Sequence, residues 1–298
     1  MTTPTTQAVE ETEAAAGGEY TGRFIDLNGC RHHYLDWGNP EAPPLLMVHG
    51  LTQHGHSFDG VARRMRARYH CIALDVRGRG ESDWASQDTY GYETYARDVA
   101  ALLEALEIPA AHYLGTSMGG LIAMTLAIGA PEKFLSLAMN DIGPHLGRVG
   151  MERIGSYTKD LPAQFKSLDA YLDQRLIPAF PWLAQRPRGP LLKAAQWTVK
   201  PDGGGGYRLR YDPLVTAGVG ADAEGLAAFE TLLWKGFGNL SCPILLIRGA
   251  ESMLLEPGTV EEMRAAQPKL EVASVPGVGH APSLDEPEAR EALAAFFG

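Results

Sequence analysis

The 298-residue sequence has few cysteines, no excess of positive charge and no long apolar run. Cys30, Cys71 and Cys242 are odd in number and too scattered for a disulfide framework or a metal-ligand motif. The formal net charge of −10 argues against binding to a nucleic-acid backbone. No apolar run approaches the roughly 20 residues that a membrane span needs, and the N-terminus lacks the basic-then-apolar pattern of a secretory signal. We therefore expect a cytoplasmic protein with reduced thiols and without nucleic-acid or membrane partners.

Short apolar runs alternate with segments of helical spacing along most of the chain. Leu45–Val48, Cys71–Leu74 and Ile244–Ile247 are typical of buried parallel strands. Between such runs, apolar residues recur at the spacing of an amphipathic helix, as in Tyr95–Leu106. The alternation predicts an α/β fold with a mostly parallel sheet and helices on both faces. Ligands of such sheets bind beyond the carboxyl ends of the strands.

The alternation is interrupted once. From His145 to about Leu233 the sequence is helical in pattern and rich in aromatic residues and prolines. We expect residues 145–233 to form a helical cap, inserted into a core of residues 19–144 and 234–298. The alternative is that this segment only adds helices to the main domain. Residues 1–18, rich in Thr, Ala and Glu, are expected to be disordered.

A G-x-S-x-G motif, Gly115–Gly119, separates a candidate strand from an apolar helical segment. A strand, a sharp turn and a helix are the setting in which this motif exposes a nucleophilic serine, here Ser117. Glycines allow the neighbouring backbones to approach closely, and N–H groups at the helix N-terminus can stabilise an oxyanion. The alternative is an ordinary glycine-rich turn.

Together with other motifs, this one makes the chain resemble the α/β-hydrolase family from about residue 20 onward. The resemblance implies the α/β-hydrolase fold, Ser117 as nucleophile and His280 as base, and no metal or cofactor. A histidine can deprotonate a serine near neutral pH and then protonate the leaving group. The motifs that carry the resemblance, in the family's order, are His49-Gly50, Asp75-x-Arg77-Gly78-x-Gly80-x-Ser82, Gly115-x-Ser117-x-Gly119 and Gly277-x-Gly279-His280.

The carboxylate that orients the histidine is open at this level. Asp141 directly follows a candidate strand and is favoured, although it could instead stabilise the turn at Gly143-Pro144. Glu251 follows the next candidate core strand and is the alternative, or simply a solvated charge. In one branch of the family the acid lies at the position of Asp141. In that branch the loop that here contains Glu251 can supply a serine beside the histidine, which Ser252 would match.

The oxyanion hole is assigned by position to the backbone N–H groups of Leu51 and Met118. Asp75 and Arg77 are expected to connect the loops at this edge of the sheet. Five polar and aromatic residues are candidates for contact with substrate: His49, Gln53, His54, Trp84 and Trp182. Each could instead have a structural role, and for His49 the structural role is favoured.

The predicted function is hydrolysis of a carboxylic ester, thioester or lactone through an acyl-enzyme. The alternatives are a C–C bond hydrolase of ring-cleavage products, a cofactor-free oxygenase and a non-catalytic small-molecule receptor on the same fold. The expected partner is a small acyl substrate, and the expected assembly is a monomer or homodimer.

Overall fold

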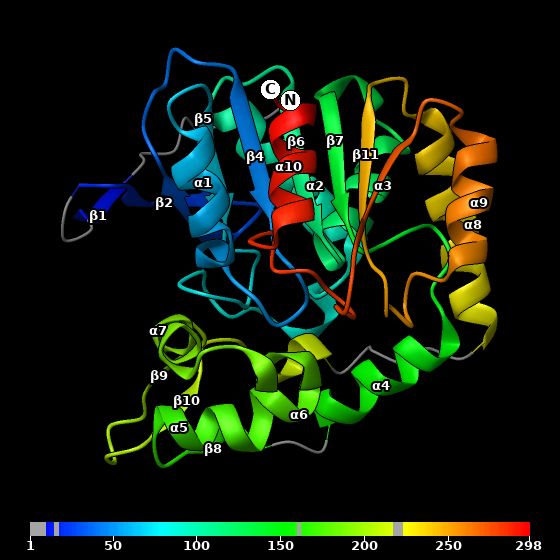
Figure 1. Cartoon of the computed structure of the whole chain (residues 1–298). Helices are drawn as coiled ribbons and strands as arrows, with labels where there is room; N and C mark the ends of the chain where they lie inside the picture. The colour runs from blue at the N-terminus through cyan, green and yellow to red at the C-terminus, as the bar shows by residue number, and fades with distance from the viewer. Residues whose placement is uncertain (1–9, 15–17, 160–161, 217–222) are drawn as a thin grey trace.

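The computed structural model describes residues 10–14, 18–159, 162–216 and 223–298. Nine strands of these residues form one sheet in the order β1-β2-β3-β5-β4-β6-β7-β11-β12 (Figure 1). From β5 to β12 all neighbouring strands are parallel, whereas β1, β2, β3 and β5 pair with one another antiparallel. The strands are β1 (Glu10–Ala14), β2 (Thr21–Leu27), β3 (Cys30–Asp36), β4 (Pro44–Val48), β5 (His70–Leu74), β6 (Ala111–Thr116), β7 (Phe134–Asn140), β11 (Ile244–Gly249) and β12 (Glu271–Val275).

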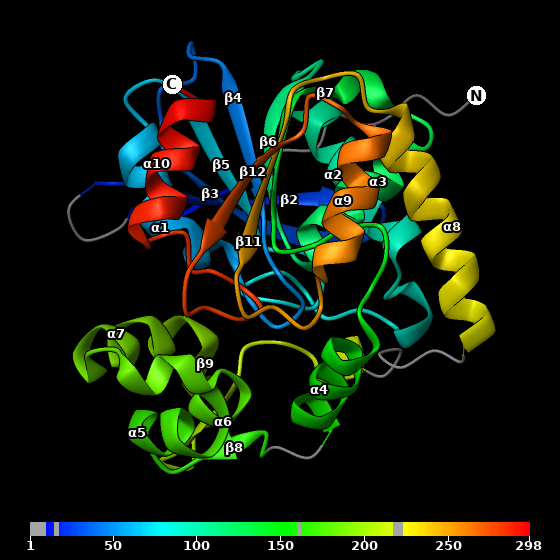
Figure 2. The same ribbon diagram turned by 45° about the vertical axis from the view of Figure 1, so that its right-hand side comes forward.

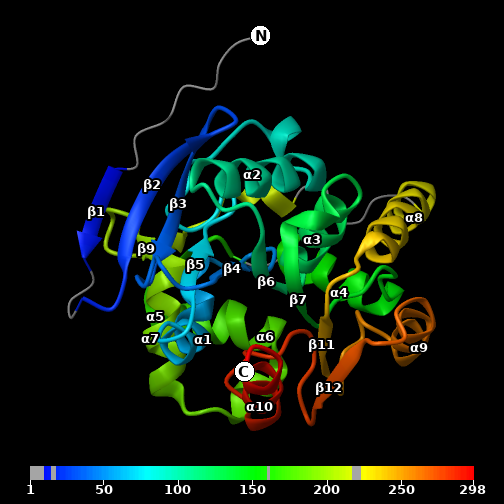
Figure 3. The same ribbon diagram turned by 90° about the horizontal axis from the view of Figure 1, so that it is seen from above.

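Helices cover both faces of this sheet (Figure 3). Buried side chains of α2 (Tyr92–Ala105), α3 (Met118–Ala127), α8 (Ala223–Asn239) and α9 (Pro257–Ala266) share one apolar cluster with one face of the sheet. Those of α1 (Asp59–Met65) and α10 (Pro287–Phe296) share a second cluster with the other face. The predicted mostly parallel sheet with helices on both faces is confirmed.

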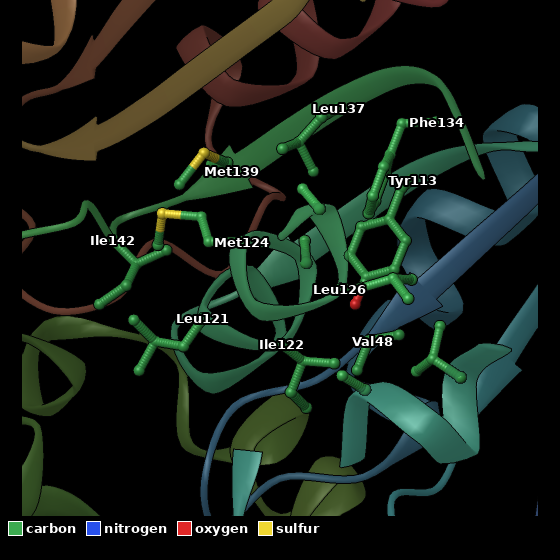
Figure 4. Packing of buried hydrophobic residues seen from close by; sticks show 14 of the residues in the cluster. Val48, Tyr113, Leu121, Ile122, Met124, Leu126, Phe134, Leu137, Met139 and Ile142 are labelled. Carbon is green, nitrogen blue, oxygen red and sulfur yellow. The ribbon is translucent and has the colours of Figure 1, made fainter. Parts of the chain in front are cut away.

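Helix α3 is buried on nearly every side. Leu121, Ile122 and Met124 of this helix are at most 4% exposed, and they lie among the side chains of β4, β6 and β7 (Figure 4). Burial of each such side chain is worth about 1.5–3 kcal/mol. The Tyr113 hydroxyl on β6 also donates to the Gly119 carbonyl at 2.9 Å. The turn between β6 and α3 is therefore fixed by the apolar packing of α3 and by the hydrogen bond from Tyr113.

A group of short elements lies beyond the carboxyl ends of the parallel strands (Figures 1 and 2). It has its own apolar cluster, which includes Phe165, Tyr171, Leu172 and Tyr211. These residues pack several of the elements against one another, whereas Met151 and Ile154 of α4 pack against the main core. The elements are α4 (Arg148–Lys159), β8 (Gln164–Phe165), α5 (Leu168–Tyr171), the π-helix η4 (Leu172–Leu176), α6 (Ile177–Ala179), η5 (Pro181–Gln185), α7 (Arg188–Thr198), β9 (Val199–Pro201), β10 (Tyr207–Leu209) and η6 (Pro213–Thr216).

We had expected this region to be helical, but it also contains strands. Strands β8, β10 and β9 form a small antiparallel sheet. The hairpin β9–β10 forms because the glycine run between the strands can turn tightly. Asp202 Oδ1 stabilises that turn by accepting hydrogen bonds from the N–H groups of Gly204 and Gly206, at 2.7 and 2.9 Å.

Helix α8 crosses the boundary predicted near Leu233. It runs unbroken to Asn239, and Leu233 and Phe237 are buried in the main core. Gly236 permits the close approach to α3, because a Cβ at Gly236 would lie 1.8 Å from the Met124 carbonyl oxygen. The part that we propose as a cap therefore ends before α8.

The N-terminal segment also differs from the expected disordered tail. Residues 1–9 and 15–17 lie outside the described residues, but Glu10–Ala14 form β1 and pair antiparallel with β2. The reason is that β2 is otherwise the edge of the sheet, and its free backbone N–H and C=O groups can accept a further strand.

No helix of the described chain combines the length and apolar character that a membrane span requires. The three cysteines are thiols; Cys30 and Cys71 are buried and Cys242 is partly buried. Burial raises the pKa of Cys71 to about 12 and that of Cys242 to about 11, so these thiols are poor nucleophiles in the folded state.

We expect a thiol reagent to react slowly with the native protein. In guanidinium without reductant, the same reagent should titrate all three cysteines. The absorbance of the released chromophore measures the rate of reaction in the native and in the unfolded protein, and the final number of thiols. A final count of one thiol would show a disulfide and overturn this prediction.

Candidate active site

Ser117 occupies the sharp turn between β6 and α3. Its φ of 50° and ψ of −111° lie in a region that residues with a side chain rarely adopt. The conformation persists because the surroundings leave no alternative: a Cβ at Gly119 would lie 1.9 Å from the Val48 carbonyl oxygen, and one at Gly115 would lie 2.6 Å from the Gly119 backbone. The turn holds Ser117 partly exposed at the tip of its strand.

The structure brings Ser117, His280 and Asp141 into one chain of hydrogen bonds, although they are far apart in sequence. Ser117 Oγ lies 2.8 Å from His280 Nε2. His280 Nδ1 lies 2.7 Å from Asp141 Oδ2. When the carboxylate accepts the Nδ1 proton, Nε2 is left as an acceptor for the serine hydroxyl.

Asp141 is completely buried and is held by donors on both carboxylate oxygens. Besides His280, Oδ2 accepts from the Ser252 hydroxyl at 2.6 Å, and Oδ1 accepts from the Gly249 N–H at 2.7 Å. Its own N–H donates to the Ile247 carbonyl at 2.7 Å. These bonds fix the carboxylate in a single orientation toward the imidazole.

Glu251 does not take this place. Its side chain is exposed, and its backbone N–H donates to the Val278 carbonyl at 2.9 Å. Of the two carboxylates considered from the sequence, the one that faces His280 is therefore Asp141, and Ser252 contacts Asp141 rather than the imidazole.

The two N–H groups expected to form an oxyanion hole lie beside Ser117. Met118 is the first residue of α3, so its N–H has no acceptor within the helix. Leu51 follows Gly50, where a Cβ would lie 3.6 Å from Ser117 Cβ. The Gly50 carbonyl is 2.7 Å from His49 Nδ1 and accepts from the Gln53 N–H at 3.1 Å. Because the peptide bond is trans, the Leu51 N–H points away from those groups.

His49 is a structural ring, which corrects its inclusion among the substrate contacts. It is 0% exposed, and its two ring nitrogens face the Gly50 carbonyl and the Val76 N–H, at 2.7 and 3.0 Å. Burial lowers its pKa to about 4, so the ring is neutral at physiological pH.

Gln53 and His54 lie in the same loop. Gln53 Oε1 accepts from the Gly50 N–H at 2.9 Å, so this side chain braces the turn before Leu51. His54 is buried, and its Nε2 lies 3.1 Å from Thr198 Oγ1 at the end of α7. Burial lowers the pKa of His54 to about 3, and its Nδ1 has no hydrogen-bond partner among the residues that the structure describes. His54 thus connects the loop after β4 to the end of α7.

The two tryptophans differ in position. Trp84 is 48% exposed. Trp182 lies against the loop that carries His280, since a Cβ at Gly279 would be 2.7 Å from its ring. The Phe180 ring meets Trp182 edge-on at 5.6 Å. Trp182 is therefore placed against the residue that precedes His280.

Asp75 connects the loops at this edge, as the sequence predicted. It lies 2.8 Å from His33 Nδ1 and accepts from the Gly55 and Glu81 N–H groups at 2.6 and 3.0 Å. Burial alone would raise its pKa, but the His33 hydrogen bond and the other donors lower it to about 2. Arg77 makes two hydrogen bonds to Asp98, at 2.6 and 2.7 Å.

The role of Asn140, the residue before Asp141, was not predicted from the sequence. Its Nδ2 donates to Thr116 Oγ1 at 3.1 Å and to the Pro282 carbonyl at 2.9 Å. The amide therefore joins the residue before Ser117 to the loop after His280. The only signal in the sequence is its place at the end of a strand. The described residues contain no group of three His, Cys, Asp or Glu side chains arranged to hold a metal ion.

Known proteins resemble this chain over most of its length. The 3-hydroxybutyrate-oligomer hydrolase of Cupriavidus necator is 38% identical over 278 residues, which are 90% of this chain and 92% of that protein. The 2-(acetamidomethylene)succinate hydrolase of Mesorhizobium japonicum is 28% identical, over 92% and 93% of the two chains. The crystal structure of an alpha/beta hydrolase from Novosphingobium aromaticivorans matches with a TM-score of 0.82 and 29% identity, over 93% of this chain and 98% of that one. A family model described as alpha/beta hydrolase fold matches residues 43–287, and the chain belongs to this family.

Proposed function

We propose that the chain is a serine hydrolase that cleaves carboxylic esters through an acyl-enzyme on Ser117. The observation that carries the proposal is the hydrogen-bonded series from Ser117 through His280 to Asp141, with spacings of 2.8 and 2.7 Å. A serine hydroxyl is a weak nucleophile until a base accepts its proton, and this geometry supplies the base and its orienting carboxylate.

The reaction follows from the positions of these groups. Ser117 Oγ attacks the ester carbonyl while His280 Nε2 takes the hydroxyl proton. The carbonyl oxygen becomes an oxyanion that accepts hydrogen bonds from the N–H groups of Leu51 and Met118. When the C–O bond breaks, His280 returns the proton to the departing alcohol. Water, deprotonated by His280, then attacks the acyl-enzyme, and the acid leaves as Ser117 regains its proton.

The substrate class that we propose is a short ester of a hydroxyalkanoic acid. Support comes from the 38% identical relative, whose name specifies oligomers of 3-hydroxybutyrate and which matches over nearly its whole length. In the elements between His145 and Thr216, which we propose as a cap, Trp182 lies against the loop of His280 and Phe180 lies against Trp182. These rings suit an aliphatic acyl chain better than a strongly polar one.

A substrate panel tests the proposal. We expect release of acid from 3-hydroxybutyrate dimers and trimers and from p-nitrophenyl acetate, with slower turnover of acyl thioesters, lactones and dienone acids. Acid release can be followed by pH-stat titration. Protein pre-treated with a fluorophosphonate is the matched control and should release nothing.

Two other results of the substrate panel would contradict the ester hydrolase function. Turnover of the dienone acid with no turnover of any ester would favour C–C bond hydrolysis. Saturable binding of an ester without acid release would favour a receptor.

A further inference from the structure

Arg79 contacts both residues of the proposed oxyanion hole. It lies in the loop after β5 and is 0% exposed. Its Nε donates to the Leu51 carbonyl at 3.1 Å, and its Nη2 lies 3.4 Å from Met118 Sδ. Nη1 donates to the Arg77 carbonyl at 2.8 Å and to the Tyr95 hydroxyl at 2.9 Å. The guanidinium therefore contacts the carbonyl of Leu51 and the side chain of Met118, the two residues whose N–H groups form the proposed oxyanion hole.

All of these partners are uncharged. Within the described chain, no carboxylate forms an ion pair with Arg79, and the nearby acids have other partners: Asp98 binds Arg77, and Asp75 binds His33. The remaining neighbours are aromatic, with the Tyr95 ring centroid 4.9 Å from the guanidinium carbon. Burial of a charge without an opposite charge is unfavourable, and an arginine that served packing alone would be expected to have a carboxylate partner.

We propose that Arg79 is a positioning residue of the oxyanion hole, which fixes the Leu51 loop and keeps a positive charge next to the developing oxyanion. The inference rests on the proposed ester hydrolase function. Arg79 does not touch substrate; it acts through the peptide groups and side chain that it contacts. A fixed charge in a dry site favours the anionic tetrahedral state over the neutral ester, because no solvent has to reorganise around it.

Replacement of Arg79 should therefore weaken the transition state selectively. We expect Arg79→Met to lower kcat/KM for p-nitrophenyl acetate by about 10²-fold, the lower end of the loss found when an oxyanion donor is removed. The affinity for a trifluoromethyl ketone, which forms an anionic hemiketal with Ser117, should fall by a similar factor. The affinity for the corresponding secondary alcohol, which carries no charge, should stay unchanged.

Two further variants separate charge from hydrogen bonding. Arg79→Gln keeps a donor near the Leu51 carbonyl but removes the charge, and it should resemble Arg79→Met; it also replaces that variant if the methionine protein does not fold. Arg79→Lys keeps the charge and should recover most of the lost ketone affinity. Arg97→Met, an exposed change on α2, is the matched control and should leave kcat/KM and both affinities unchanged.

The outcomes distinguish this inference from the proposed function. If the wild type neither hydrolyses esters nor binds the ketone, the hydrolase proposal fails first. If the wild type does both, fluorophosphonate titration gives the fraction of active sites in each variant. Arg79→Met or Arg79→Gln with fewer active sites, but with wild-type turnover and ketone affinity at each remaining site, would show a purely structural residue and overturn the inference.

Discussion

Ser117→Ala should lower ester turnover by about 10⁶-fold, the loss seen when the nucleophile of such a serine–histidine–aspartate series is removed. The variant should still fold, because alanine keeps the Cβ that already occupies the strained turn, and only the hydroxyl that lies 2.8 Å from His280 Nε2 is lost. Stopped-flow and steady-state release of p-nitrophenol measure the loss. A fluorophosphonate should add one adduct to the wild type, on Ser117, and none to the variant, as read by peptide mass spectrometry.

The chain contains a matched control for this experiment. Ser136 also lies 2.8 Å from a histidine nitrogen, His112 Nδ1, but it is buried on β7 and the imidazole packs against Tyr69 and Phe297. Ser136→Ala should keep wild-type turnover and labelling. Full activity in Ser117→Ala, or an adduct on any other residue, would refute the assignment of the nucleophile.

The positions of Ser117, His280 and Asp141 could be predicted because each follows a strand or precedes the last helix in a parallel sheet. The carboxyl ends of parallel strands meet at one edge, so residues far apart in sequence gather there without any local signal between them. The Gly119 contact with Val48 shows why the motif needs its glycines, since a Cβ 1.9 Å from a carbonyl oxygen cannot be accommodated.

Side-chain direction could not be read from the sequence. Asp141 and Glu251 both follow strands that end at this edge, and only the described hydrogen bonds of Gly249 and Ser252 show which carboxylate is turned inward. Arg79 illustrates the same limit. A motif of Asp, Arg and Gly predicts loops joined by hydrogen bonds, but the absence of an acidic partner for Arg79 in the described chain depends on where Asp75 and Asp98 point.

The elements around the site were predicted least well. Strands β9 and β10 have only three residues each, too few for a periodic pattern, and their pairing depends on the turn that Asp202 stabilises. The domain boundary that we predicted near Leu233 falls inside α8, which continues to Asn239 and packs on α3 at Gly236. The hairpin thus depends on a local turn, whereas the course of α8 depends on packing against a distant segment, which overrides the local preferences of a short stretch.

Asp141→Asn should lower kcat by about 10⁴-fold without unfolding the protein. Asparagine has nearly the same size, and its amide can donate a hydrogen bond to His280 Nδ1 across the 2.7 Å that now separates Nδ1 from Asp141 Oδ2. That bond would hold the imidazole in the tautomer with its proton on Nε2, which cannot accept the Ser117 proton. The variant would also lack the negative charge that stabilises the imidazolium. Steady-state kinetics, with circular dichroism to verify folding, measure the effect.

Two companion variants locate the effect at Asp141. Glu251→Gln changes an exposed side chain and should alter kcat by less than about threefold, since surface changes seldom exceed about 0.5 kcal/mol. Ser252→Ala removes the 2.6 Å bond to Asp141 Oδ2 and should cost about tenfold, because a hydrogen bond to a charged group is worth about 1.5 kcal/mol. The ordering of the three variants matters more than any single rate. A crippled Glu251→Gln beside an Asp141→Asn that keeps most of its turnover would show that Glu251, after a movement of its loop, orients His280 during catalysis.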